Sequence, residues 1–424
     1  MEVRLRPRPL MSRPYRAGLN CTVNPGRCPG LVCHAPSGLT AIEAQSDEMN
    51  RRTLLITLAS LPVLRAAAAP EPDQVPESNR ASESDQAPPV VFDPVLPDRT
   101  LNFPADHGAH PGFRTEWWYA TGWLTLPDGS PLGFQSTFFR VRTGIGEHNP
   151  SAFAPRQLIL AHAAIADPRL GRLRHDQRAA RVGLGRAGYE TGQTGVWVGD
   201  WRFEQDADRY RARIDGDGFG YDLTLVPDGP PMLNGTAGFS RKAPDPSNAS
   251  YYYSRPHLQV SGTVTLDGRR QAVTGLAWLD HEWSSEYLPS GAKGWDWMAL
   301  NLADGGALMA FRMRGAEGQS IWSAATLRPA GGAPEALAPD AVTFEPLRRW
   351  RSPRTGIDYP VEWRVRIGTR TLRLAPLMDD QELDSRRSTG TVYWEGAVRA
   401  QEDGREVGRG YLEKTGYGET IRVG

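Results

Sequence analysis

Residues 106–123 read DHGAHPGFRTEWWYATGW, a stretch that carries histidines, an arginine, carboxylates and several large aromatic side chains. Gly108, Pro111 and Gly112 exclude a helix at its start, whereas the aromatic run from Trp117 onward favours a β-strand. The stretch therefore predicts a loop that leads into a strand. We expect the strands that follow to build a barrel wall facing this one.

The rest of the chain repeats short apolar or aromatic runs that are separated by Asp-Gly turns. These turns lie at residues 128–129, 228–229, 267–268, 304–305 and 403–404. Long amphipathic helical patterns are absent from the sequence. Regularly spaced short strands with such turns are typical of barrels and sandwiches, so the predicted fold class is all-β.

Two parts of the chain match each other in order. Residues 116–142 contain a Trp-bearing strand, an Asp-Gly turn and the sequence FRVR, and residues 295–314 contain the same series ending in FRMR. Such an ordered match is what a duplication leaves behind. We therefore predict two similar antiparallel β-barrels, at residues 100–286 and 290–424.

The first 99 residues carry the signals of export rather than those of a fold. Arg51 and Arg52, a short apolar run and a stretch of alanines form an export signal at residues 49–69, of either the twin-arginine or the ordinary secretory type. Residues 1–48 would then be a disordered upstream extension, and the Pro-rich residues 70–99 a disordered linker. We expect a periplasmic or secreted protein without a stable membrane span.

The composition narrows the possible chemistry. The 49 basic and 49 acidic residues balance, which gives no reason to expect a nucleic-acid partner. Cys21, Cys28 and Cys33 all precede the export signal, so the mature chain would lack disulfides, a thiolate nucleophile and cysteine-ligated zinc. The motifs of serine hydrolases, phosphate-binding loops and dinucleotide sites are absent. We expect no cofactor.

One difference between the two halves selects the candidate site. Superposing the strands that close the halves places Asp280 on Glu413, but the second half has no counterpart of His281, Glu282 and Trp283. A feature that only one copy carries is a better candidate for function than a shared one. Asp280, His281 and Glu282 offer acid or base groups, and a histidine titrates near neutral pH. The alternative is a strand end whose polar groups bond to loops.

Glu116 is the fourth candidate for acid–base chemistry. Beside Trp117 and Trp118 it is either a carboxyl in an apolar barrel mouth, where burial makes it a proton donor, or an outward side chain on an alternating strand. The side chains expected to contact a ligand are Trp117, Trp118, Tyr119, His162, Tyr252, Tyr253 and Trp283.

Two further histidine positions have structural alternatives. His162 lies in the apolar run LILAHAAI and is either a hydrogen-bonded core histidine or a residue that lines the cavity. His107 and His110 have a His-x-x-His spacing, which has little specificity for a metal outside a helix. We therefore expect no metal site.

The ordered motifs resemble the AttH-like and carotenoid 1,2-hydratase family of lipocalin-like proteins. The resemblance extends from about residue 103 to the C-terminus and rests on WWY at 117–119, AHA at 161–163, YYS-x-P at 252–256, DHEW at 280–283 and YLEKTGY at 411–417. It implies two lipocalin-like β-barrels, in agreement with the duplication.

The resemblance also implies a chemistry. In the hydratase branch, acid catalysis adds water across a terminal isoprenoid double bond through a tertiary carbocation, which an aromatic face stabilises. The His-x-Trp motif of that branch matches His281 and Trp283. Its Tyr-x-Asp pair aligns with Ala310 and Arg312, and an arginine cannot act as the acid. The AttH-like secreted branch is therefore the better fit.

We expect an exported protein whose first barrel binds a small apolar ligand, either isoprenoid or fatty-acyl. Acid–base hydrolysis or hydration of this ligand would use Asp280, His281, Glu282 and Glu116. The alternative is a carrier that binds the ligand without turnover, because barrel mouths serve both purposes. The sequence gives no oligomeric state.

Overall fold

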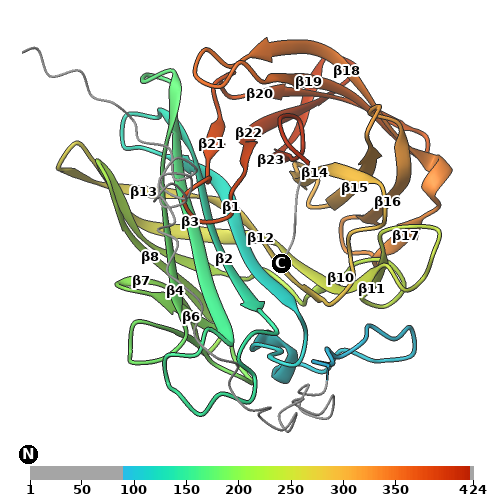
Figure 1. Ribbon diagram of the computed structural model, residues 1–424. Helices are drawn as coiled ribbons and strands as arrows, with labels where there is room; N and C mark the ends of the chain where they lie inside the picture. The colour runs from blue at the N-terminus through green and yellow to red at the C-terminus, as the bar shows by residue number, and fades with distance from the viewer. Residues whose placement is uncertain (1–88, 421–424) are drawn as a thin grey trace, which may run out of the picture. The chain divides into compact units, whose positions relative to one another are not determined.

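The computed structural model describes residues 89–420, which fold into two antiparallel sheets and confirm the predicted all-β class (Figure 1). The predicted upstream extension, the signal peptide and the first part of the linker lie outside the described residues. Within residues 89–420, no helix has the length and apolar character needed to cross a membrane.

The first sheet contains thirteen strands. Their bounds are β1 (Thr115–Thr125), β2 (Pro131–Arg142), β3 (Gln157–Asp167), β4 (Arg172–Arg181), β5 (Ala187–Tyr189), β6 (Gly195–Val198), β7 (Trp201–Asp206), β8 (Arg209–Gly216), β9 (Phe219–Val226), β10 (Met232–Leu233), β11 (Phe239–Arg241), β12 (Ala249–Leu266) and β13 (Arg269–Ser284). The order is β4-β3-β2-β1-β13-β12-β9-β8-β7-β6-β5, with β10 and β11 paired to β12. A short 3₁₀ helix, η2 (Ala105–His107), precedes β1.

The second sheet contains ten strands. Their bounds are β14 (Ala292–Leu302), β15 (Ala307–Gly315), β16 (Ser320–Arg328), β17 (Glu335–Leu337), β18 (Val342–Arg351), β19 (Asp358–Ile367), β20 (Arg370–Pro376), β21 (Glu382–Asp384), β22 (Val392–Glu402) and β23 (Arg405–Lys414), with the 3₁₀ helix η3 (Pro339–Ala341) before β18. The order is β17-β16-β15-β14-β23-β22-β20-β19-β18, with β21 paired to β22. The sheet curls until β16 contacts β18, which nearly closes a barrel (Figure 1).

The same neighbourhood of strands occurs in both sheets. The order β12-β13-β1-β2-β3 of the first sheet recurs as β22-β23-β14-β15-β16 in the second. In both sheets the Trp-bearing strand pairs with the strand that contains an aromatic residue, Leu and an acid in succession, at 278–280 and at 411–413. The internal match seen in the sequence therefore corresponds to a repeated strand order.

The central strands of the first sheet are buried on both faces. On β1 the burial extends over nearly the whole strand, because one face packs into the interior of its own sheet and the other faces the second sheet. Trp118 belongs to the interior core, whereas Tyr119 belongs to the cluster that it shares with Trp297 and Tyr411 of the second sheet. The apolar runs reflect this double burial.

The two sheets approach each other closely at Gly133 on β2. A Cβ atom there would lie 2.5 Å from Tyr411 Oη and 2.9 Å from Ala397 Cβ, both in the second sheet. We expect Gly133→Val to lower the free energy of unfolding by about 1–3 kcal/mol, because the added side chain overpacks this contact. Chemical denaturation measures the change, and Gly229→Ala, which would meet nothing within 4 Å, is the control. Equal stability of both variants would contradict the prediction.

Candidate functional site

Strand alternation places the candidate residues on two faces. In the pairing of β1 with β13, Trp118 lies opposite His281 and Tyr119 lies opposite Asp280. Successive side chains of a strand point to opposite faces. The interior of the first sheet therefore receives Glu116, Trp118, Tyr253, His281 and Trp283, and the face toward the second sheet receives Trp117, Tyr119, Tyr252, Asp280 and Glu282.

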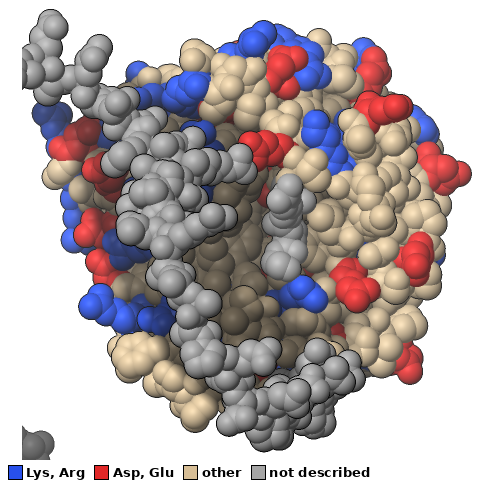
Figure 2. Space-filling view, viewed as in Figure 1, with Lys and Arg blue, Asp and Glu red and all other residues tan. Residues whose placement is uncertain are grey.

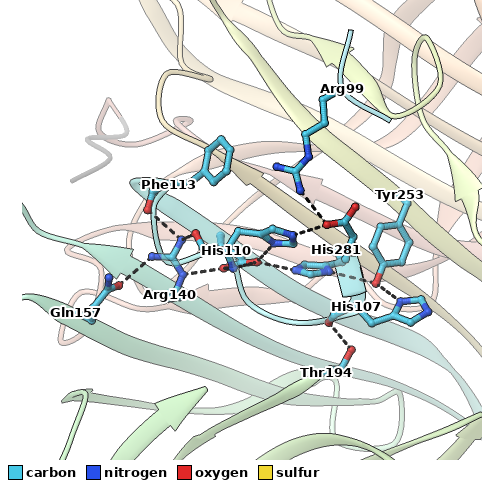
Figure 3. A network of polar contacts seen from close by, with 11 residues as sticks. Arg99, His107, His110, Phe113, Arg140, Gln157, Thr194, Tyr253 and His281 are labelled. Carbon is cyan, nitrogen blue, oxygen red and sulfur yellow. Dashed lines mark hydrogen bonds and ion pairs between the residues drawn. The ribbon is translucent and has the colours of Figure 1, made fainter. Parts of the chain in front are cut away.

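Glu116 joins three residues of the network that Figure 3 labels, namely His110, Arg140 and His281. Its fully buried carboxylate accepts hydrogen bonds from Arg140 Nε at 2.7 Å, from His110 Nδ1 at 2.7 Å and from His281 Nε2 at 2.9 Å. Burial alone would raise the pKa of Glu116, but the charges of Arg140 and His110 outweigh it and hold this pKa well below its usual range. Glu116 is therefore a buried carboxylate rather than a proton donor.

His110 bridges two carboxylates and stacks on an indole. Its Nδ1 donates to Glu116, and its Nε2 donates to Asp106 Oδ1 at 3.0 Å. The ring lies parallel to that of Trp283, with centroids 3.7 Å apart. Burial opposes the charge of His110, but Glu116 and Asp106 raise its pKa above the ordinary value. The loop before β1 is thus held by a charged imidazole.

His281 is fully buried and has a partner at each ring nitrogen. Because Nε2 donates to Glu116, Nδ1 accepts from Tyr253 Oη at 3.1 Å, and Tyr253 Oη in turn accepts from His107 Nδ1 at 2.8 Å (Figure 3). Burial lowers the pKa of His281, and it lowers the pKa of His107 to about 4. His281 is therefore a neutral link between β13 and the loop.

Three of these side chains offer metal-ligand atoms. One atom each from His110, Glu116 and His281 lies within 4.8 Å of the others. The Glu116 oxygens already accept from both imidazoles and from Arg140. The arrangement fits a hydrogen-bond network better than a metal centre.

A cavity of about 330 Å³ lies between the two sheets. Its aromatic lining includes Trp117, Tyr119 and Phe139 of the first sheet and Trp295, Trp297 and Phe311 of the second. Figure 2, viewed as Figure 1, shows a central recess whose visible described surface is mainly tan, so few charged side chains line the part in view.

The position of this cavity differs from the expected one. The sequence analysis placed the ligand inside the first barrel, but both sheets line the cavity. Inside the first sheet, large side chains such as Phe134, Phe138 and Trp201 pack into one core. The cavity instead lies where the aromatic faces of two curled sheets meet without filling the space between them.

Five carboxyl residues line the cavity, namely Glu116 on β1, Asp280 and Glu282 on β13, Glu395 on β22 and Glu413 on β23. Burial raises the pKa of Asp280 to about 7 and that of Glu413 to about 7, and it raises the pKa of Glu395 well above its ordinary value. Glu282 instead pairs with Lys242 Nζ at 2.7 Å. The cavity thus combines aromatic walls with carboxyl groups that hold protons near neutral pH.

Asp280 is held by three donors. Its Oδ1 accepts from Ser254 Oγ at 2.6 Å and from Trp278 Nε1 at 2.6 Å, and its Oδ2 accepts from Tyr252 Oη at 2.6 Å. The hydroxyl of Tyr252 also accepts from Trp297 Nε1 at 2.9 Å. These contacts fix the Asp280 carboxyl at the boundary between the two sheets.

His162 on β3 lines the cavity and is also hydrogen-bonded on both sides. Gln177 Nε2 donates to Asp384 O, which leaves Gln177 Oε1 to accept from Ser388 Oγ at 2.7 Å. Ser388 Oγ then accepts from His162 Nε2 at 2.9 Å, and His162 Nδ1 accepts from Tyr393 Oη at 2.8 Å. His162 is thus both a hydrogen-bonded histidine and a residue that lines the cavity.

The sequence analysis did not select the groups that the second sheet contributes. Glu413 occupies the position of Asp280 in the second half and is not among the predicted site residues, yet both line the cavity. Glu395 lies in a strand that the sequence motifs did not single out. The alignment of Glu413 with Asp280 is the signal that could have identified Glu413. Side chains at equivalent positions of two sheets that face each other can line the same cavity.

The fold and the site define an all-β protein in which two antiparallel sheets, one of them a nearly closed barrel, line one cavity. The sequence profile of the AttH-like family matches residues 94–417. The chain belongs to this family.

Solved structures agree with this assignment. The crystal structure of an AttH protein from Nitrosomonas europaea is 53% identical, covers 77% of this chain and 100% of its own, and has a TM-score of 0.72. Kievitone hydratase from Nectria haematococca shares the fold at 16% identity, with a TM-score of 0.57 over 77% of this chain and 96% of its own. None of the curated proteins compared with the chain matches it.

Proposed function

We propose that the protein binds a small apolar ligand, isoprenoid or fatty-acyl, in the cavity between the sheets and performs acid–base hydration or hydrolysis on it. The observation that carries this proposal is the Asp280 carboxyl in an aromatic cavity, with its pKa raised by burial to about 7. A carboxyl with a pKa near the working pH both donates and accepts protons efficiently.

The aromatic walls support the same chemistry. Trp117, Trp295 and Trp297 present ring faces or edges to the cavity, and an aromatic face stabilises a cationic carbon. Kievitone hydratase, a hydratase by name, has the same fold. Hydration is therefore the first reaction to test, with ester hydrolysis as the second.

The proposed roles differ from the initial assignment at two residues. Asp280 and Glu282 reach the cavity and take the acid–base roles. His281 has both ring nitrogens bonded inside the first sheet, and Glu116 bonds to it. In this proposal His281 and Glu116 are positioning residues that fix the strands from which Asp280 projects.

A carrier without turnover is the second candidate. The observation that favours it is that both carboxyl groups already have partners within the protein. Asp280 accepts three hydrogen bonds, and Glu282 is paired with Lys242. Such groups can shape a binding cavity without exchanging protons with the ligand.

The test combines ligand retention with turnover. The purified protein is analysed by native mass spectrometry, then incubated in ¹⁸O-water with geranylgeraniol and with a palmitoyl ester. Hydration and hydrolysis both place ¹⁸O in the product. We expect incorporation by the wild type and a decrease of about 10²–10⁴-fold in Asp280→Asn.

Each outcome separates the candidates. Retention of either probe without ¹⁸O incorporation would support the carrier, and absence of both would contradict the proposal. Glu345→Gln is the matched control, because Glu345 is exposed on β18 and pairs with Arg364. Far-UV circular dichroism and probe retention show whether Asp280→Asn is folded.

We also propose export to the periplasm or the medium. Arg51 and Arg52 ahead of a short apolar run and a stretch of alanines support this. The expected result is a mature N-terminus near residue 70, read by N-terminal sequencing of the secreted or periplasmic form. A protein that retains residues 49–69 in the cytoplasmic fraction would contradict it.

A further inference from the structure

We infer that Glu395 and Glu413 form a proton-sharing carboxyl pair that exchanges a proton with the bound ligand, so that the second sheet supplies catalytic residues to the cavity. The catalytic part of this inference rests on the proposed function. The pairing itself does not.

The sheet register places the two carboxyl groups side by side. Glu395 on β22 lies directly opposite Glu413 on β23, and both line the cavity. Residues opposite each other in an antiparallel pair have Cβ atoms about 4.5–5.5 Å apart on the same face. Two carboxylates carried by such neighbouring side chains in a buried space cannot both be charged without a large cost, so we infer that the pair retains a proton.

Each member of the pair has one donor that orients it. Tyr119 Oη on β1 donates to Glu395 Oε1, and Trp295 Nε1 on β14 donates to Glu413 Oε2 at 3.0 Å. Burial and the neighbouring Glu413 charge raise the pKa of Glu395, whereas burial raises that of Glu413 to about 7. Each contact engages one oxygen of its carboxyl group, so the second oxygen of each is the one we assign to the ligand.

Other titratable groups surround the pair. Those that line the same cavity from neighbouring elements are Glu116 and Tyr119 on β1, Arg140 on β2, His162 on β3, Lys242 after β11, Asp280 and Glu282 on β13, Tyr287 after β13, and Tyr393 on β22. Lys242 is engaged by Glu282, and His162 is neutral because burial lowers its pKa to about 3. The ammonium nitrogen Nζ of the nearby Lys414 lies 3.4 Å from the centroid of the Trp394 ring. The pair is therefore surrounded mainly by acids and phenols.

The pair can complete a hydration and return to its starting state. In this sequence it performs the proton transfers that the proposed function assigns to Asp280, and turnover that is lost in Asp280→Asn but kept in both glutamine variants would return them to Asp280. The protonated Glu395 gives its proton to one carbon of a double bond, which forms a C–H bond as the π bond breaks. A water oxygen bonds to the cationic carbon, and the proton that it loses passes to the Glu413 carboxylate. The pair then holds one proton again, and the reverse sequence is a dehydration.

The pairing is tested by infrared titration of the carboxyl C=O band in the full chain. We expect Glu395→Gln to lower the titration midpoint of Glu413, and Glu413→Gln to lower that of Glu395, each by at least about one pH unit, because removal of a like charge favours ionisation of the other group. Glu345→Gln should change neither midpoint. If each glutamate titrates unchanged when the other is replaced, the pairing is wrong.

The catalytic role is tested by ¹⁸O incorporation into geranylgeraniol. We expect each glutamine variant to lose about 10²-fold or more of the turnover while it retains the probe in native mass spectrometry, and Glu395→Asp to recover part of the rate. Wild-type turnover that persists in both glutamine variants would overturn the catalytic role.

The two proposals fail in different ways. If the wild type itself shows no turnover, the proposed function and the catalytic role fail together, but the infrared titration still decides the pairing. If a glutamine variant does not fold, as judged by circular dichroism, Glu395→Asp and Glu413→Asp replace it. In each aspartate variant, the infrared titration midpoint of one carboxyl group should still depend on the charge of the other.

Discussion

Replacement of Arg140 by alanine is expected to lower the free energy of unfolding by about 3–5 kcal/mol. Arg140 is fully buried, and its Nε pairs with the fully buried Glu116 carboxylate at 2.7 Å. Its other nitrogens bond to Gln157, to the carbonyl of His110 and to the carbonyl of Phe113. In the variant, the Glu116 carboxylate and the carbonyls of His110 and Phe113 lose the guanidinium that binds them in the interior.

Urea or guanidinium denaturation measures the change. Arg364→Ala is the control, because Arg364 and Glu345 form an ion pair with side chains that are 51% and 59% exposed. Such a surface pair is worth less than about 1 kcal/mol. If the two arginine variants lose equal stability, the interior network is not the stabilising element that its geometry indicates.

The contribution of His110 to stability should depend on pH. The pKa of His110 in the folded protein lies above its ordinary value of 6.5. Its contribution is therefore fully present below pH 6.5 and is lost as the pH rises through the folded-state value. We expect His110→Asn to cost about 3 kcal/mol at pH 5.5 and clearly less at pH 9.

The contribution of Glu116 should have the opposite pH dependence. Its folded-state pKa lies well below the ordinary 4.5, so its contribution is present above pH 4.5 and is lost as the pH falls through the folded-state value. Since burial lowers the pKa of His107 to about 4, that residue also destabilises the fold in acid.

Difference curves between each variant and the wild type isolate the two effects. The measurement is the midpoint of chemical denaturation between pH 3 and 9 for the wild type, His110→Asn and Glu116→Gln. His148→Asn, in the loop after β2, is the control for His110. Difference curves that do not change with pH would show that neither charge is stabilised by the network.

The all-β fold could be predicted because its signals are local. Asp-Gly turns between aromatic runs determine hairpins, and the repeated Trp strand revealed two units that share a strand order. How two curled sheets pack against each other depends on contacts far apart in sequence, such as Gly133 with Tyr411. No local pattern contains that information.

In the candidate site, too, the sequence does not predict which face of a strand a ligand would contact. Asp280, His281 and Glu282 are neighbours in sequence and were treated as one constellation. On a strand they point alternately, so His281 bonds inside the first sheet while Asp280 and Glu282 reach the cavity. Period-2 alternation was available from the sequence, but which face held the space for a ligand was not.

The walls of the cavity belong to both sheets, and bonds such as Trp123 Nε1 to Gly410 O and Asn301 Nδ2 to Ala277 O join them. A polypeptide cut between β13 and β14 would therefore yield two fragments, each with an uncovered aromatic surface and half of a binding site. Gene fragments for laboratory work should keep both units on one polypeptide or be co-expressed, since either fragment alone would be prone to aggregate.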